Sequence, residues 1–280
     1  MKLAFKVDLS DKIIAITGGG GILMSEFAKI LSASGAKVAL LDINESAARL
    51  AAESINNEGG NAISVKCDCL DKESIKRAKN EITKAFGNVN MLINGAGGNN
   101  PKGTTDIEYM TKDITDKKTF FDLDSEGIKF VFNLNVLSAF LVTQVFAEDM
   151  VKSGSGNIIN ISSMNAFKPL TKIPAYSAAK AGVSNLTQWL AVHFAPCNIR
   201  VNAIAPGFFV TNQNKSLLFN EKGEATERTN KILTHTPLNR FGIVEDLAGT
   251  LLWLASDNAS GFVTGVIIPV DGGFSAYSGV

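Results

Sequence analysis

Residues 12–42 have the sequence KIIAITGGGGILMSEFAKILSASGAKVALLD, and the predicted fold starts from this stretch. An apolar run, Lys12–Thr17, leads into four glycines and an amphipathic segment that ends at Gly35. A second apolar run, Ala36–Asp42, follows directly. Runs that are apolar throughout, rather than alternating, are typical of parallel strands covered on both faces. The stretch therefore predicts a strand, a crossover helix and a parallel strand.

The same alternation continues along the chain. We expect helices over 45–57, 72–86, 128–151, 175–194 and 245–256, and strands over 61–66, 89–94, 156–162, 199–204 and 263–270. Right-handed crossovers between such strands give an α/β fold with a doubly wound parallel sheet, the three-layer Rossmann fold, here in one domain over residues 1–280. Two polar stretches interrupt the pattern, an inserted loop at 98–127 and a substrate loop at 208–239, which we expect to be lids or binding loops.

Composition excludes several classes of protein. With 280 residues, of which 45% are hydrophobic and 19% charged, the chain can bury a core, so it is not disordered. Because 27 Lys and Arg balance 27 Asp and Glu, the basic excess of a nucleic-acid binder is missing. No uninterrupted apolar run of about 18 residues and no secretory signal is found. We therefore expect a cytoplasmic protein without a nucleic-acid or membrane partner.

Cysteine and histidine usage predicts no metal site and no disulfide scaffold. The three cysteines are too few for a scaffold, and the pair Cys67 and Cys69 has no second Cys/His cluster to complete a zinc site. The two histidines, His193 and His235, are too few for a His-based site. Packing is the expected role of these residues.

The glycine turn Gly18–Gly21 predicts a dinucleotide site. Glycines let the backbone approach a pyrophosphate, and the following helix offers free N–H groups at its N-terminus. Asp42 ends the next strand, where a carboxylate can accept hydrogen bonds from both adenosine ribose hydroxyls and would repel a 2′-phosphate. No Lys or Arg stands in the turn or just after Asp42. We therefore expect NAD rather than NADP; a packing turn with a solvated aspartate is the alternative.

Tyr176 and Lys180 are four residues apart in IPAYSAAKAG, so they share one face of a predicted helix. A free phenol, with a pKa of about 10, is a poor base at neutral pH. A neighbouring ammonium would lower the pKa of the phenol and make proton exchange with an alcohol feasible. Such a pair is common by chance, and it gains weight only from the motifs around it.

Over nearly its whole length the chain resembles the short-chain dehydrogenase/reductase family. The matching features are the turn Thr17–Gly21, Asp68 after the third strand, Asn94–Gly97 in place of N-N-A-G, Asn135 in NVLSAF, Ser163 thirteen residues before Tyr176, the Tyr176 and Lys180 pair, the segment from Pro206 and Gly207 to Thr211, and Val270–Gly273. The coincidence of these motifs is far more specific than any one of them.

The resemblance implies a role for each matched residue. Tyr176 exchanges a proton with the substrate oxygen, and Lys180 lowers the pKa of that tyrosine and holds the nicotinamide ribose. Ser163 hydrogen-bonds the substrate oxygen, and Asn135 holds a water that links Lys180 to solvent. The implied NAD contacts are Gly18, Gly21, Ile22, Leu23, Asp42, Ile43, Asp68, Cys69, Asn94, Gly95, Ala96, Gly97, Tyr176, Lys180, Pro206, Gly207, Phe209 and Thr211.

The chain departs from the family pattern in three places. Ile22 and Met24 stand where the second and third turn glycines fall, so we expect an altered phosphate contact with main-chain donors retained. Gly95 stands where the family usually has asparagine. The stretch between Gly97 and Asn135 is longer than usual, and we expect it to add structure near the mouth of the active site.

The loops that set substrate identity are polar. They are rich in Asn, Gln, Thr and Lys, which suits a polyhydroxylated, acidic substrate, because each buried hydroxyl needs a partner. We expect Asn99, Asn165, Lys168 and Phe208 to contact the substrate, although core packing is an equal explanation for Phe208. Lys102, Lys168 and Lys215 are candidate partners for a carboxylate.

Within the family the motifs are most similar to the subgroup that interconverts D-mannonate and D-fructuronate with NAD. Another polyol or aldonate dehydrogenase, such as a gluconate 5-dehydrogenase type, is the alternative. A protein that binds NAD as a redox sensor without turnover is a third reading, which the presence of Tyr176 and Lys180 opposes. The family resemblance also implies a homotetramer or homodimer, with the helices of Asn135 and Tyr176 packed between subunits.

Overall fold

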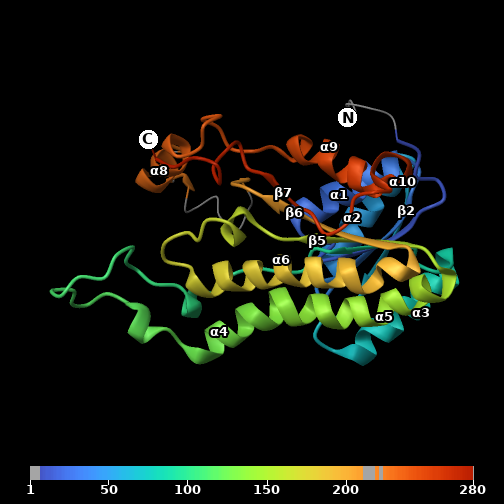
Figure 1. Cartoon of the computed structure of the whole chain (residues 1–280), viewed down its shortest axis with the longest axis horizontal. Coiled ribbons are helices and arrows are strands. Elements are labelled where there is room, and N and C mark those ends of the chain that lie inside the picture. The colour runs from blue at the N-terminus through green and yellow to red at the C-terminus, as the bar shows by residue number, and fades with distance from the viewer. Residues whose placement is uncertain (1–6, 211–217, 221–222, 280) are drawn as a thin grey trace.

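The computed structural model describes residues 7–210, 218–220 and 223–279. One sheet of seven parallel strands forms its centre, in the order β3-β2-β1-β4-β5-β6-β7 (Figure 1). The strands are β1 Ile13–Thr17, β2 Lys37–Asp42, β3 Asn61–Lys66, β4 Met91–Asn94, β5 Gly156–Ile161, β6 Ile199–Pro206 and β7 Ile267–Val270. Strand β1 pairs with both β2 and β4, so the strand order reverses there.

Helices and short turns connect the strands. The helices are α1 Ile22–Ala33, α2 Glu45–Asn57, α3 Lys72–Phe86, α4 Ser125–Phe132, α5 Ser138–Ser153, α6 Pro174–Phe194, α8 Glu227–Thr234, α9 Val244–Ala255 and α10 Asp257–Ser260. The 3₁₀ turns are η1 Pro101–Gly103, η2 Phe120–Asp122, η4 Met164–Ala166 and η5 Ala195–Cys197, and η3 Asn133–Leu137 is a π-helical turn.

Two hydrophobic cores cover the two faces of the sheet. Phe27 of α1, Ile55 of α2 and Leu251 of α9 are buried in one core, and Phe146 of α5 with Leu186 of α6 in the other, which α3 completes. Figure 1 shows α1, α2 and α9 on one side of the sheet and α3, α5 and α6 on the other. The expectation of a three-layer, doubly wound α/β fold is confirmed.

Capping residues fix several helix boundaries. The side chain of Asp71 accepts a hydrogen bond from the N–H of Glu73 at the start of α3, and Asp124 accepts from Glu126 and Gly127 at the start of α4. The cap at Asp124 explains why the long helix begins three residues earlier than the predicted 128. The last strand is shorter than the predicted 263–270, because residues 263–265 turn before β7 begins.

Helices α4 and α5 form one continuous helical segment, Ser125–Ser153, through the π-helical turn between them. This segment is long enough to cross a membrane, and its most apolar window of 18 residues has a mean hydropathy of 1.7, although polar residues interrupt it. Half of its most apolar window is buried inside the protein, as in a core helix. Because Phe146 and Met150 of α5 are part of the core, length and hydropathy alone do not indicate a membrane here.

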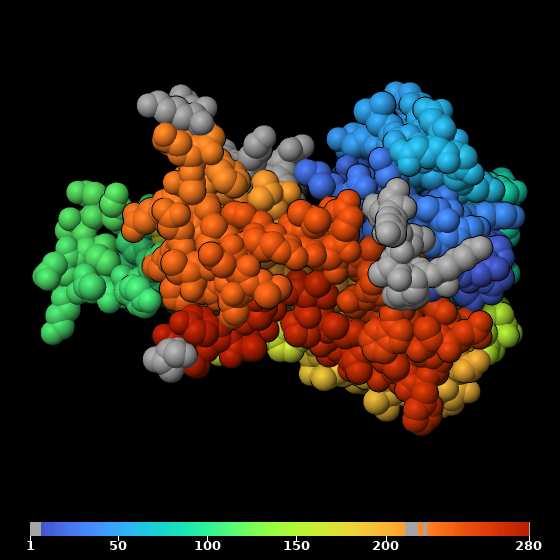
Figure 2. All heavy atoms as spheres, turned by 90° about the horizontal axis from the view of Figure 1, so that it is seen from above, coloured from blue at the N-terminus to red at the C-terminus, as the bar shows by residue number. Residues whose placement is uncertain are grey.

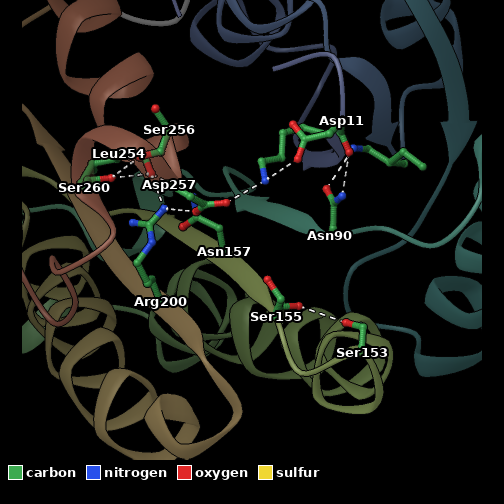
Figure 3. A network of polar contacts seen from close by, with 12 residues as sticks. Asp11, Asn90, Ser153, Ser155, Asn157, Arg200, Leu254, Ser256, Asp257 and Ser260 are labelled. Carbon is green, nitrogen blue, oxygen red and sulfur yellow. Dashed lines mark hydrogen bonds and ion pairs between the residues drawn. The ribbon is translucent and has the colours of Figure 1, made fainter. Parts of the chain in front are cut away.

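A polar network closes the edge of the sheet where the strands begin (Figure 3). The Asp257 carboxylate accepts from Lys12 Nζ at 2.7 Å and from Arg200 Nη2 at 2.8 Å, and Asn157 Nδ2 donates to the Leu254 carbonyl at 2.8 Å. Burial alone would raise the pKa of Asp257, but these cations outweigh it and hold the pKa below its usual value. The network ties the starts of β1 and β6 to α10 and β5 to α9, and it leaves the opposite edge for the functional site.

Candidate active site

A cleft of about 530 Å³ lies at the edge where the strands end. It spans the reversal of strand order between β1 and β4, the place where open α/β sheets bind ligands. The lining residues are Gly18, Gly20, Gly21, Ile22, Leu23, Met24, Asp42, Gly95, Gly97, Gly98, Ile161, Ser162, Ser163, Tyr176, Lys180, Pro206, Gly207, Phe208 and Phe209. We call this space the catalytic cleft.

The glycine turn and Asp42 form one end of the cleft. The N–H of Gly20 donates to Asp42 Oδ2 at 2.9 Å, and the N–H of Asn44 donates to Oδ1 at 2.8 Å. These bonds hold the half-buried carboxylate at the mouth of the turn. Helix α1 begins at Ile22, and the N–H groups of Ile22 and Leu23 have no acceptor within the helix because they lie in its first turn. No acidic residue of this turn competes for them. The end of the cleft thus combines a ribose acceptor with phosphate donors.

Met24 and Gly95 fit together behind this turn. A Cβ at Gly95 would lie 2.1 Å from Met24 Sδ, 2.6 Å from its Cγ and 2.7 Å from the Thr17 carbonyl oxygen, so a side chain here would displace both the methionine and the backbone. Met24 is 4% exposed, and the N–H of Gly95 donates to Thr17 Oγ1 at 3.0 Å. The two departures from the family pattern are therefore complementary, since the methionine fills the space that a residue larger than glycine would need at position 95.

Tyr176, Ser163 and Lys180 lie together on the floor of the cleft. Because α6 begins at Pro174, Tyr176 is in its first turn and Lys180 one turn further on. The Tyr176 hydroxyl is hydrogen-bonded to Ser163, and Lys180 Nζ lies 5.6 Å from the centroid of the tyrosine ring. Lys180 Nζ also donates to the Ile161 carbonyl at 2.8 Å, and burial lowers the pKa of this lysine to about 8.

The pKa of Tyr176 depends on how its phenol is buried. Burial raises the pKa of its phenol, and the hydrogen bond with Ser163 offsets this only in part. Lys180 is not among the groups that shift the pKa of Tyr176 in this structure, so the lowering of that pKa by Lys180 stays a prediction. The ammonium lies beside the ring and donates to Ile161, while desolvation disfavours the phenolate. At neutral pH Tyr176 is a phenol that can give a proton.

Asn135 lies in the π-helical turn and holds the loop that follows β4 close to Lys180. Its Nδ2 donates to the carbonyls of Gly98 and Val131, both at 2.7 Å, and its Oδ1 accepts from the N–H of Gly98 at 3.2 Å. A Cβ at Gly97 would lie 2.6 Å from this Oδ1 and 3.1 Å from Lys180 Nζ. The amide therefore positions the loop; its role as a water ligand stays a prediction.

Comparisons with known proteins agree with this geometry. A family model of the short-chain dehydrogenases, described as enoyl-(acyl carrier protein) reductase, matches residues 24–275. An uncharacterized oxidoreductase of Haemophilus influenzae is 58% identical over 281 residues, covering 100% of this chain and 99% of its own. The chain belongs to the short-chain dehydrogenase/reductase family.

Two further similarities extend across whole chains. The uncharacterized oxidoreductase UxuB of Bacillus subtilis is 51% identical to this short-chain dehydrogenase/reductase over 273 residues, 98% of either chain. A crystal structure from Haemophilus influenzae, of a candidate D-mannonate oxidoreductase with bound NAD, superposes with a TM-score of 0.94 at 59% identity and covers 98% of both chains.

The cleft brings together most of the predicted residues, but not all of them. Ser163, Tyr176 and Lys180 line it with most of the expected cofactor contacts. The predicted contacts that are not in its lining are Ile43, Asp68, Cys69, Asn94 and Ala96. Asn94 is buried and donates to Thr143 and Asn160, whereas Ile43 is exposed. Thr211 lies outside the described residues.

The predicted substrate residues are distributed unevenly. Phe208 lines the cleft, and Lys168 lines a neighbouring cavity that also includes Phe208. Asn99 is exposed and donates to Thr104, and it lines neither space. Asn165 is buried and lines neither space, and its Oδ1 has no hydrogen-bond partner among the described residues. The expectation that Asn99 and Asn165 line the pocket is therefore not met in this structure.

Two of the lysines predicted to pair with a substrate carboxylate, Lys102 and Lys168, lie in different parts of the structure. Lys102 lies 3.9 Å from Asp124 and lines neither the cleft nor the neighbouring cavity. Lys215 lies outside the described residues. Arg240, just after the substrate loop, forms an ion pair with Asp246.

Sequence reasoning missed Gly20, Met24, Gly98, Ile161 and Ser162, all of which line the cleft. Gly20 could have been found from its place inside the turn, and Gly98 from its place just after the Asn94–Gly97 motif. Met24 gave no such signal, because its contact with Gly95 joins distant parts of the chain. Ser162 Oγ lies 2.7 Å from Ser184 Oγ and also donates to the Lys180 carbonyl, so it ties the end of β5 to α6.

Asp42→Asn is expected to raise KM for NAD by roughly 10-fold, because a charged acceptor of ribose hydroxyls is lost. The discrimination against NADP should fall as well, since the repulsion of the 2′-phosphate disappears. Asparagine keeps one oxygen for the N–H of Gly20 or Asn44, so the turn stays tied. Steady-state kinetics with both cofactors measure the change, and Asp113→Ala on the exposed insert is the control. Unchanged cofactor discrimination would contradict the role of Asp42.

Proposed function

We propose that the chain interconverts a secondary alcohol and a ketone of a sugar acid, D-mannonate and D-fructuronate, with NAD as the cofactor. The observation that carries the oxidoreductase chemistry is the cluster of Tyr176, Ser163 and Lys180 in a cleft that continues into the glycine turn. The candidate D-mannonate oxidoreductase with bound NAD, 59% identical over nearly the whole chain, supports the substrate and the cofactor.

The cleft fits a dinucleotide. Asp42 is held by two main-chain N–H groups at the place of an adenosine ribose, and a negative charge there favours NAD over NADP. The free N–H groups of Ile22 and Leu23 would hold the phosphates at the positive end of α1. When bound, the nicotinamide accepts or gives the hydride.

The chain's own residues handle the substrate oxygen and its proton. Ser163 would hydrogen-bond the carbonyl oxygen and stabilise the negative charge that develops on it. In the reduction direction, Tyr176 donates its phenolic proton to that oxygen; in the oxidation direction, it takes the proton back. Lys180, buried and bonded to the Ile161 carbonyl, places a positive charge beside the tyrosine ring and favours the phenolate that forms.

A substrate screen tests the proposal. The purified protein is mixed with NADH and, in turn, fructuronate, tagaturonate, 5-ketogluconate and neutral ketoses, and the loss of nicotinamide absorbance is followed. We expect the highest kcat/KM with fructuronate. Tyr176→Phe run in parallel shows that the oxidation of NADH belongs to this site. A higher kcat/KM with 5-ketogluconate would support the gluconate 5-dehydrogenase alternative and contradict the assignment to fructuronate.

The same proposal includes a cytoplasmic homodimer or homotetramer. Phe140 of α5 and Trp189 and Val192 of α6 are exposed, at 42%, 57% and 78%, on the outer helical layer seen in Figure 1. Exposed apolar side chains on adjacent helices favour association with another subunit. Light scattering of the purified protein measures this, and a monomer mass would contradict it.

A further inference from the structure

A second cavity, of about 590 Å³, borders the catalytic cleft and shares Phe208 with it. Its walls come from residues 168–172 just before α6, from the insert at Glu108, from α8 and from the C-terminal residues Phe274 and Tyr277. Figure 1 shows α8 and the C-terminus at the same end of the molecule as the projecting insert, and Figure 2 shows the insert, in green, next to the orange segment that includes α8. We call this space the cationic cavity.

Positive charge dominates the lining of the cationic cavity. Its charged side chains are Lys168, Lys172, Arg228, Lys231, Glu108 and Glu227. Lys231 is paired with Glu108, and the pKa of Glu108 is lowered first by this lysine and further by Lys172 and Arg228. Over residues 7–210, 218–220 and 223–279, neither Lys172 nor Arg228 forms an ion pair. With Lys231 paired to Glu108, the remaining charged groups of the lining are Lys168, Lys172, Arg228 and one carboxylate, Glu227, so the cavity keeps an excess of positive charge that an anion can neutralise.

Lys172 is held in a fixed position relative to Tyr176. Its φ of 71° lies in the left-handed region, which a residue other than glycine keeps only where the surroundings determine it. Its carbonyl accepts from the N–H of buried Thr105 at 2.8 Å, which ties the insert to this loop. Pro174 begins α6 two residues later, and Tyr176 follows in the first turn. The backbone of Lys172 is thus fixed just before the catalytic helix, and its side chain lines the cavity.

We propose that Lys172 and Arg228 bind the carboxylate of the substrate in the cationic cavity. This inference rests on the proposed sugar-acid function and names the residues that select for the acid. Phe208 borders both spaces, and residues 168–172 of the cationic cavity lead directly into α6, which carries Tyr176. A substrate with its reacting carbon at Tyr176 would therefore extend its carboxylate past Phe208 toward these cations. A guanidinium suits this task, because its parallel N–H groups match both oxygens of a carboxylate.

The test compares an acid with a neutral sugar. For the native protein, Lys172→Gln, Arg228→Gln and the double variant, kcat/KM is measured with fructuronate and with fructose, a neutral ketose of the same length. The ratio of acid to neutral sugar is expected to fall roughly 10- to 100-fold for each charge removed, as for a lost charge-assisted hydrogen bond. Lys84→Gln, on the exposed face of α3, should leave the ratio unchanged.

Independent readouts separate this inference from the proposed substrate and from misfolding. The dissociation constant for NADH, from nicotinamide fluorescence, checks that each variant keeps its cleft. In the native protein, higher ionic strength should raise KM for fructuronate and leave KM for fructose unchanged. This measurement needs no variant. If the protein prefers another sugar acid but the ratio of kcat/KM between acid and neutral sugar still falls in the variants, the fructuronate assignment fails and the carboxylate site stands. An unchanged ratio in the folded double variant, or a native protein that does not favour acids, overturns the carboxylate site.

Discussion

Tyr176→Phe is expected to lower kcat in both directions by about 10²–10⁴-fold, the range that a positioned general acid or base contributes. The phenyl ring keeps the shape of the cleft and loses only the hydroxyl that meets Ser163. The dissociation constant for NADH should therefore stay nearly unchanged. Stopped-flow absorbance of the nicotinamide measures the chemical step, and fluorescence titration measures NADH binding. A rate close to that of the native protein would refute the proton role.

Two controls sharpen the result. Tyr109→Phe removes a hydroxyl from an exposed residue of the insert and should leave the rate unchanged.

The pH dependence of the two directions shows which form of Tyr176 each direction needs. Because burial raises the pKa of Tyr176, the phenol is the form present at neutral pH, and reduction should proceed there. Oxidation needs the phenolate and should speed up as pH rises, so parallel pH profiles in the two directions would contradict this assignment.

The strand and helix pattern, with its glycine turn, is largely readable from the sequence, because it depends on local apolar periodicity. Residues 12–42 form β1, α1 and β2 nearly as the pattern predicts. The spacing of four places Tyr176 and Lys180 on one helix face, whereas Ser163 was identified only through the family resemblance. Strand and helix boundaries move by a few residues where a side chain such as Asp124 caps the helix.

Features that depend on contacts across the fold are not readable. The direction of the Tyr176 pKa shift follows from burial, which spacing does not reveal. The π-helical turn at Asn135 depends on an amide that bonds Gly98, a residue of another segment. The cationic cavity joins Lys172 to Arg228 across more than fifty residues of chain, so neither stood out among the lysines and arginines.

Gly95→Asn, which restores the usual residue of the family, is expected to destabilise the protein by about 3 kcal/mol or more and to weaken NADH binding. The reason is steric: even a Cβ at this position would lie 2.1 Å from Met24 Sδ, and overpacking of a filled site costs about 1–3 kcal/mol before the rest of the side chain is added. Urea unfolding and fluorescence titration with NADH measure the two effects. Gly249→Asn on α9 is the control, because nothing lies within 4 Å of a Cβ there.

Met24→Gly tests whether Gly95→Asn is destabilising because of Met24, or whether any change in this part of the cleft has the same effect. Alone, it should destabilise the protein by about 2–5 kcal/mol, since a buried methionine side chain is removed from the start of α1. Combined with Gly95→Asn, it removes the overlap with the methionine but not the 2.7 Å approach to the Thr17 carbonyl oxygen. The double variant should therefore be more stable than the sum of the two changes predicts, yet less stable than the native protein. NADH binding should recover in the same direction. Strictly additive losses would mean that Met24 and Gly95 act independently, and their complementary packing would then not account for the two departures from the family pattern.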